Sequence, residues 1–144
     1  MDILIVKATA ADGDAVARLV RELAGSSNEE SRVDAAYVRQ YLAFPGRTVL
    51  LAEADGDRVG FLAFSLNPNL WHAMDACLIE DLFVRPAWRG RGVGRALVAR
   101  VMAEAARQGW AEVSVSTGRD NQAALSLYRN LGLVEEYVLL EKHF

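Results

Sequence analysis

The stretch Val84-Arg-Pro-Ala-Trp-Arg-Gly-Arg-Gly-Val-Gly-Arg95 decides the fold. Three glycines in it remove side chains where the backbone must turn or approach a ligand: Gly90, Gly92 and Gly94. Three arginines lie among them: Arg89, Arg91 and Arg95. A helix that begins here presents unpaired N–H groups and the positive end of its dipole. A turn that only reverses the chain would need the glycines but not the arginines, so the stretch predicts a phosphate-binding turn between a strand and a helix.

Two common phosphate motifs do not fit this stretch. The dinucleotide fingerprint needs glycines at positions i, i+2 and i+5, and the third position is Arg95 counted from Gly90 or Leu97 counted from Gly92. The Walker pattern needs Gly-Lys followed by Ser or Thr, and the sequence lacks it. We therefore expect a phosphate ligand of another kind.

The charge distribution also singles out this region. Between Arg85 and Arg107 the chain has six arginines and one acid, Glu104. The segment carries +5 of a chain whose net charge is −3, which leaves −8 elsewhere. The acidic total argues against a general nucleic-acid binder, and the basic island indicates a compact anionic ligand bound at one place. A solvated helix face is the alternative, and the glycines favour the ligand site.

Length and composition predict one globular domain over residues 1–144. Hydrophobic residues make up 52% and charged residues 24% of the chain, which excludes a disordered protein. No apolar run approaches the ~18 residues of a membrane span, and the first residues do not resemble a signal peptide. The single cysteine, Cys77, forms no internal disulfide, and one Cys with two His residues makes a metal site unexpected. We expect a cytoplasmic protein without a metal, in which Cys77 is a small buried strand residue.

Hydrophobic periodicity and turn residues predict the order β-α-α-β-β-β-α-β-α-β, an α/β (α+β) fold with a mixed, mostly antiparallel sheet flanked by helices. The first helix is capped by Asp12 or Asp14, the last by Asp120, and Asn67-Pro68-Asn69 is expected to break the chain. The expected strands are 3–7, 48–54, 58–66, 76–84, 112–117 and 136–141. The expected helices run from the first cap to Glu22 and over 33–43, 93–108 and from Asp120 to Leu131.

Arg89-x-x-Gly92-x-Gly94, placed after a strand and opening a helix, resembles the acyl-CoA signature of the GNAT superfamily of N-acetyltransferases. The order of elements is that family's order, and the resemblance covers essentially the whole chain, most densely over 79–132. The segments 8–24 and 79–97 resemble the diamine (spermidine/spermine) acetyltransferase branch. The resemblance implies acetyl-CoA as co-substrate and an amine as acceptor.

By the same resemblance, the cofactor lies along the end of one strand and over the glycine-rich turn. The backbone of Leu82, Phe83 and Val84 pairs with the pantetheine amides as an added strand would, and one N–H, that of Val84, faces the thioester oxygen. Their side chains are expected to be core and walls. Asn121 and Ala124 contact the pantetheine arm. The pyrophosphate lies over Arg89, Gly90, Arg91, Gly92, Val93, Gly94 and Arg95.

Acetyl transfer to an amine needs a proton acceptor, because an alkyl amine of pKa ~10.4 is about three units from neutral at pH 7, a cost of roughly 4 kcal/mol. Glu80 and Asp81 lie in an apolar strand, where a carboxylate is costly unless the site uses it. Strict alternation would place Glu80 on one face of the strand and Asp81 on the other. A salt-bridge partner or a sheet edge is the alternative for each acid. The resemblance favours Glu80 as amine anchor and water-mediated base, with Asp81 as second choice.

The leaving thiolate needs a proton donor, and a phenol is a suitable weak acid. Asn121 and Tyr128 are seven residues apart, which puts them on one face of a helix. The resemblance implies that Tyr128 is the acid and contacts the cofactor. Core packing between Ala124 and Leu131 is the alternative for Tyr128.

The sequence departs from the diamine branch after the first helix. That branch places an aromatic and an acid there, whereas this chain reads Gly25-Ser26-Ser27-Asn28 followed by Glu29 and Glu30. The expected acceptor is therefore a small cationic primary amine: a polyamine, a diamine or a lysine-like amino acid. A protein N-terminus or lysine is one alternative acceptor, and a CoA-binding module without turnover is another function. No nucleic acid or membrane partner is expected, and family habit suggests a homodimer.

Overall fold

The computed structural model describes residues 2–144. Its five strands form one sheet in the order β1-β2-β3-β4-β5. Neighbouring strands from β1 to β4 are antiparallel, and β5 runs parallel to β4. The strands are β1 (Leu4–Lys7), β2 (Arg47–Ala54), β3 (Asp57–Asn69), β4 (Met74–Val84) and β5 (Val113–Val115). The mixed, mostly antiparallel sheet predicted from the sequence is confirmed.

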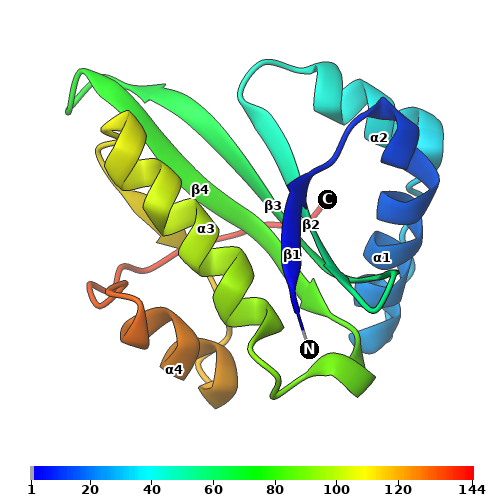
Figure 1. The fold of residues 1–144 in the computed structure, drawn as a ribbon. Helices are drawn as coiled ribbons and strands as arrows, with labels where there is room; N and C mark the ends of the chain where they lie inside the picture. The colour runs from blue at the N-terminus through cyan, green and yellow to red at the C-terminus, as the bar shows by residue number, and fades with distance from the viewer. Residues whose placement is uncertain (1) are drawn as a thin grey trace.

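Helices cover both faces of this sheet (Figure 1). One pair, α1 (Gly13–Ser26) and α2 (Ala35–Ala43), lies on one face, and α3 (Val93–Gln108) with α4 (Gln122–Asn130) lies on the other. Single turns of 3₁₀ helix precede α1 (Ala10–Asp12) and follow β4 (Pro86–Trp88). The helix over 93–108 begins and ends as predicted, and Gly109 terminates it with a φ of 74°.

Strand alternation divides the apolar side chains between two cores. On β2, Leu50 and Ala52 face α3, whereas Leu51 faces α1. The core under α3 includes Leu97, Val98 and Val101 of that helix with Val59 and Ile79 of the sheet. The core under α1 and α2 includes Val16, Leu19 and Val38 with Phe61 and Phe83. The central strands are therefore buried on both faces.

β4 breaks its own alternation in the middle. Asp81 pairs with Ala63 and Ile79 pairs with Phe64, so Glu80 is an extra residue in the strand, a β-bulge. Before it, Cys77 and Ile79 pack under α3; after it, Leu82 and Val84 do so. Glu80 and Asp81 consequently point to the same face, the one covered by α1 and α2. The prediction that the two acids occupy opposite faces is wrong, because it assumed an unbroken period of two.

Three further predicted boundaries are wrong, whereas the predicted N-cap of α1, Asp12, is confirmed in position. The helix α1 continues past Glu22 to Ser26. β3 continues through Pro68 to Asn69, because the long hairpin partner β4 pairs with it to the end. Asn121, and not Asp120, caps α4, since the Asn121 side chain accepts a hydrogen bond from the Ala124 backbone N–H at 3.2 Å. Asp12 occupies the N-cap position of α1, but its carboxylate accepts from the backbone N–H of Thr9 and pairs with Arg58.

The strand predicted over 136–141 is absent from the described part of the chain, which has no regular structure after α4. Strand-forming side chains there, Tyr137 to Leu140, are exposed, and no strand pairs with the outer edge of β5. A strand requires a partner for its backbone groups, and this segment has none within residues 2–144. Within the same range, no helix is long and apolar enough to cross a bilayer.

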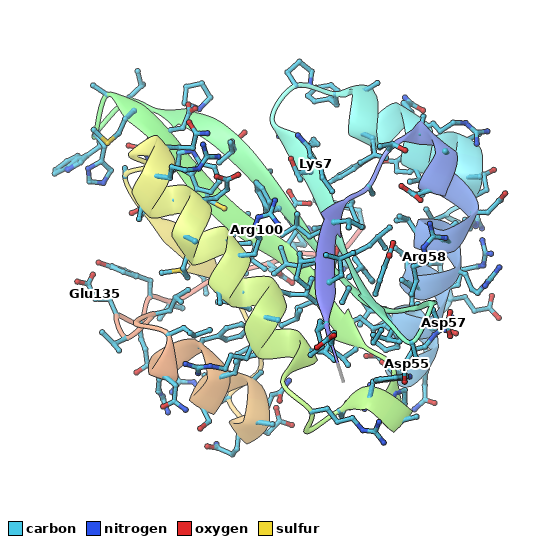
Figure 2. All side chains as sticks on the ribbon, in the orientation of Figure 1. Lys7, Asp55, Asp57, Arg58, Arg100 and Glu135 are labelled. Atoms are coloured by element: carbon cyan, nitrogen blue, oxygen red, sulfur yellow. The ribbon has the colours of Figure 1, made fainter. Side chains whose placement is uncertain are left out.

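Ion pairs join α1 to the end of the β2–β3 hairpin (Figure 2). Arg58 pairs with Asp12 at 2.8 Å, and Arg85 donates to Glu22 at 3.0 Å and to Asp57 at 3.1 Å. On the other side of the sheet, Arg100 reaches from α3 toward β1 and donates to the Ile5 carbonyl at 3.3 Å. These contacts use two of the six arginines of the basic island, Arg85 and Arg100.

Candidate active site

The glycine-rich turn has the backbone shape that its composition predicts. Gly90 and Gly92 adopt left-handed conformations with φ values of 74° and 86°, and Gly92 is the N-cap of α3. A Cβ added at either glycine would meet no protein atom within 4 Å. The turn is therefore open to a ligand at both positions, directly before the N-terminus of α3. Val93 differs, because its side chain is buried in the core and only its backbone can face the turn.

Gly94 serves a different purpose from the other two glycines. A Cβ there would lie 3.4 Å from Leu127 of α4 and 3.8 Å from Val84 of β4. Gly94 thus allows α4 and the end of β4 to approach the first turn of α3. The three elements meet beside the open turn because of this close packing.

The arginines of the basic island divide into two groups. Arg85 and Arg107 pair with carboxylates, and Arg100 with a backbone carbonyl. The second group flanks the glycines and forms no salt bridge within residues 2–144: Arg89, Arg91 and Arg95. The Arg89 Nε donates to the Val84 carbonyl at 2.9 Å, and the Arg89 guanidinium lies over the Phe83 ring. The Arg91 guanidinium lies over Trp88. Of the four arginines of the basic island that pair with no carboxylate among residues 2–144, three therefore lie at the turn.

β4 leaves part of its edge free next to the turn. β5 pairs with β4 only from Cys77 to Ile79, whereas β4 continues to Val84. The segment from Glu80 to Val84 has a strand partner on its β3 side alone. The two parallel strands therefore part at the bulge, and the backbone of Leu82, Phe83 and Val84 can accept an extended chain there. As expected, their side chains belong to the cores.

Tyr128 of α4 lies on the α3 side of the sheet, in the core against which Leu82 and Val84 of the free β4 segment pack. It is 7% exposed and packs with Ala124 and Leu127 against the core under α3. Burial raises the pKa of the Tyr128 phenol, so the hydroxyl stays protonated at neutral pH. Asn121 caps the same helix, which occupies its side-chain oxygen and leaves its amide NH₂ as a donor.

The two acids border the gap from the opposite side, together with a tyrosine that the sequence analysis missed. The Tyr41 hydroxyl, on α2, donates a hydrogen bond to Glu80 Oε2 at 3.2 Å. Burial and then the neighbouring Glu80 charge raise the pKa of Asp81. Burial, with the Glu80 carboxylate next, raises the pKa of Tyr41 far above its ordinary value. The spacing of Tyr41 from Val38 on the helix indicated that its ring faces inward. The contact of Tyr41 with Glu80 spans 39 residues and cannot be predicted from a local sequence pattern.

Cys77 is a core residue and not part of the site. It is 1% exposed, and burial raises the pKa of its thiol to about 12. Among residues 2–144, no three His, Cys, Asp or Glu side chains gather closely enough to hold a metal ion. The described chemistry thus comes from two carboxylates, two phenols and the basic turn.

The model of the acetyltransferase (GNAT) family matches residues 16–133. The chain belongs to this family. The matched range includes the glycine-rich turn, the bulged β4 and α4, which are the elements that border the gap. The GNAT fold that the resemblance implied is therefore confirmed.

Curated GNAT relatives match the chain over part of their length. An uncharacterized N-acetyltransferase of Methanocaldococcus jannaschii is 33% identical over 91 residues, which is 62% of this chain and 40% of that protein. The L-2,4-diaminobutyric acid acetyltransferase of Nocardia farcinica is 33% identical over 93 residues, 65% of this chain and 46% of that protein. The chain spans less than half the length of these two relatives.

A solved GNAT structure matches almost all of the chain. The aminoglycoside N-acetyltransferase AAC(6')-Iy, determined in complex with CoA, has a TM-score of 0.81 and 22% identity and covers 99% of this chain and 95% of its own. At that identity the likeness concerns the fold. It extends over nearly the whole chain.

Proposed function

We propose that the protein is an acetyl-CoA-dependent N-acetyltransferase that acetylates a primary amine of a small cationic acceptor. The observation that carries the proposal is the parting of β4 from β5 directly above the basic, glycine-rich start of α3. These features fit CoA: open glycines and uncompensated arginines suit its pyrophosphate, and the free β4 edge suits its pantetheine amides. Family membership supports the same activity.

Acetyl-CoA, when bound, supplies the thioester carbonyl that the amine attacks. Glu80, directly or through a water molecule, accepts the proton that the amine loses as the C–N bond forms. The Val84 backbone N–H stabilises negative charge on the carbonyl oxygen, and Tyr128 returns a proton to the sulfur as the C–S bond breaks. The base and the acid border the gap from opposite faces of the sheet, which suits attack on one side and departure on the other.

The acceptor is proposed as a polyamine, a diamine or a lysine-like amino acid. Glu80 and Asp81 present two adjacent carboxylates on one face, and the chain outside the basic island carries −8. The diaminobutyric acid acetyltransferase among the relatives is named for an amino acid with a second amine. We propose the diamine branch on this support, with a homodimer as its usual assembly.

A thiol-release assay with a panel of amines tests the proposal. The panel includes spermidine, 1,4-diaminobutane, lysine, 2,4-diaminobutyrate, an aminoglycoside and a lysine-containing peptide. Acetylation of the small diamines well above the peptide is expected. Transfer to the peptide alone would show that the acceptor is a protein lysine and not a small amine. CoA binding without transfer to any amine would favour a CoA-binding module without turnover.

A further inference from the structure

The bulge in β4 produces a cluster whose members come from three elements. Glu80 and Asp81 are consecutive on β4 yet face the same side, toward the C-terminal half of α2. Tyr41 of α2 contacts Glu80, and Arg47 at the start of β2 lies near enough to lower the pKa of Tyr41. Within the described residues, the hydrogen bond from Tyr41 is the only one that either acid accepts from a side chain.

The hydrogen bond from Tyr41 occupies one carboxylate oxygen of Glu80 and leaves the other free. Glu80 Oε2 accepts from the Tyr41 hydroxyl at 3.2 Å, which fixes the rotation of the carboxylate. Glu80 Oε1 and the two oxygens of Asp81 keep their lone pairs for other donors. Three free acceptor sites on adjacent side chains match an ammonium group, which has three N–H donors.

The ring of Tyr41 has a separate, structural task. It is half-buried and packs against the core under α1 and α2, next to Leu42. The hydroxyl at the end of the side chain donates the hydrogen bond to Glu80. Replacing Tyr41 with Phe therefore removes the contact with the acid and keeps the packing.

We propose that Tyr41 is a positioning residue that holds Glu80 beside Asp81, so that the two carboxylates together receive the ammonium form of the acceptor. The proposal deepens the proposed function, on which it rests. Without the Tyr41 hydroxyl, the Glu80 side chain gains rotamers and turns away from a neighbouring like charge. The acceptor then meets one oriented carboxylate instead of two.

Steady-state kinetics on Tyr41→Phe, with Tyr37→Phe as the matched control, tests the proposal. Tyr37 lies on the same helix and is 60% exposed, and its hydroxyl forms no hydrogen bond with another group among residues 2–144. We expect Tyr41→Phe to raise the KM for 1,4-diaminobutane roughly tenfold, the effect of losing one hydrogen bond to a charged group. The affinity for acetyl-CoA should stay unchanged, and Tyr37→Phe should behave as wild type.

A double-mutant cycle with Glu80→Ala, measured as the calorimetric affinity for 1,4-diaminobutane, separates positioning from a general effect on α2. If Tyr41 acts through Glu80, Tyr41→Phe should change that affinity less than twofold in the Glu80→Ala background. An equal loss in both backgrounds, or no loss in either, would overturn the proposal. So would an equal loss in Tyr37→Phe.

Calorimetric binding of 1,4-diaminobutane to the CoA-loaded protein distinguishes this inference from the proposed activity. Wild type could transfer no acetyl group and still bind the diamine. If the affinities of the variants for the diamine are then non-additive, the proposed activity is wrong and the positioning role holds. If wild type transfers acetyl groups but the pattern is additive, the activity holds and the positioning role fails. Absence of both transfer and binding overturns both.

Discussion

Single residues decide the chemistry of this site through their surroundings. Tyr128 is buried, Tyr41 is half-buried, and the pKa of each phenol is raised. Tyr41 donates a hydrogen bond to Glu80, whereas the Tyr128 hydroxyl forms no hydrogen bond with another group among residues 2–144. A protonated phenol without a protein partner is available to a ligand. Tyr128 therefore suits proton donation, and Tyr41 suits orientation of a neighbour.

Replacing Tyr128 with Phe tests proton donation alone, because the ring and its packing remain. We predict that kcat falls by ~10²-fold or more and that the Kd for acetyl-CoA changes little. Stopped-flow turnover and calorimetry measure the two quantities, with Tyr37→Phe as the control tyrosine. Turnover at the wild-type rate would remove Tyr128 from the role of acid.

Asp81 should make the folded protein less stable at neutral pH. Its pKa is raised above the ordinary value of 3.8, so the folded state holds the Asp81 proton more tightly than the unfolded chain does. The contribution of Asp81 to the free energy of unfolding therefore becomes less favourable as pH rises through 3.8 and above. We predict that Asp81→Asn has a higher Tm than wild type at pH 7, and that the difference shrinks below pH 3.8. A lower Tm for the variant at pH 7 would contradict this sign.

At the scale of the element, the start of α3 combines a left-handed N-cap with an open surface. Gly92 and Gly56 have similar φ values, 86° and 77°, and neither would place a Cβ near protein atoms. Their difference is location, since Gly56 lies in the β2–β3 turn. The two positions thus form a matched pair for separating backbone strain from ligand contact.

We predict that Gly92→Ala and Gly56→Ala each lower stability by roughly 1–2 kcal/mol, the cost of a left-handed residue with a Cβ. Only Gly92→Ala should also weaken CoA binding, because its new methyl group occupies the space above the helix N-terminus. Urea unfolding and calorimetry of both variants make the comparison. Normal CoA affinity in a folded Gly92→Ala protein would argue against a pyrophosphate at this turn.

The capping residue of α4 allows a similar separation. Asn121→Ala removes the cap and should cost about 1 kcal/mol of stability. Asn121→Asp keeps an oxygen for the Ala124 N–H but removes the amide donor, so stability should hold while CoA affinity falls if that donor contacts the cofactor. Thermal unfolding and calorimetry measure the two effects. If CoA affinity follows stability across both variants, Asn121 is a cap only.

At the scale of the whole molecule, charge is separated into an acidic body and a basic turn. The net charge of −3 would repel a polyanion on average, so the attraction must come from arginines close to the ligand. We predict that CoA affinity falls as NaCl rises, because screening shortens the range of these charges. Arg95→Gln should weaken binding roughly tenfold and flatten the salt dependence. Arg107→Gln, whose arginine already pairs with Glu104, serves as the control and should change neither.

The sequence predicted the fold well where local rules apply. The helix over 93–108, the β2–β3 hairpin and the burial of Cys77 follow from periodicity and turn residues. The shared face of Glu80 and Asp81 could not be predicted, because a bulge depends on the pairing of β3 with β4. Tyr41 was missed for the same reason: its partner lies 39 residues away. The prediction of a strand over 136–141 was wrong, because strand propensity does not show whether another strand is available to pair with the segment.

The extra residue in β4 reverses the parity of the strand. Odd-numbered Cys77 and Ile79 point under α3 in its first half, and even-numbered Leu82 and Val84 do so in its second. Deleting the extra residue, Glu80, would restore the period of two, so Ile79, Leu82 and Val84 would still face α3 and would keep their partners on β3. The deletion would leave Asp81 as the one acid of this pair on the face covered by α2. The inserted position therefore supplies a second carboxylate to that face at no expense to the apolar side chains on the other.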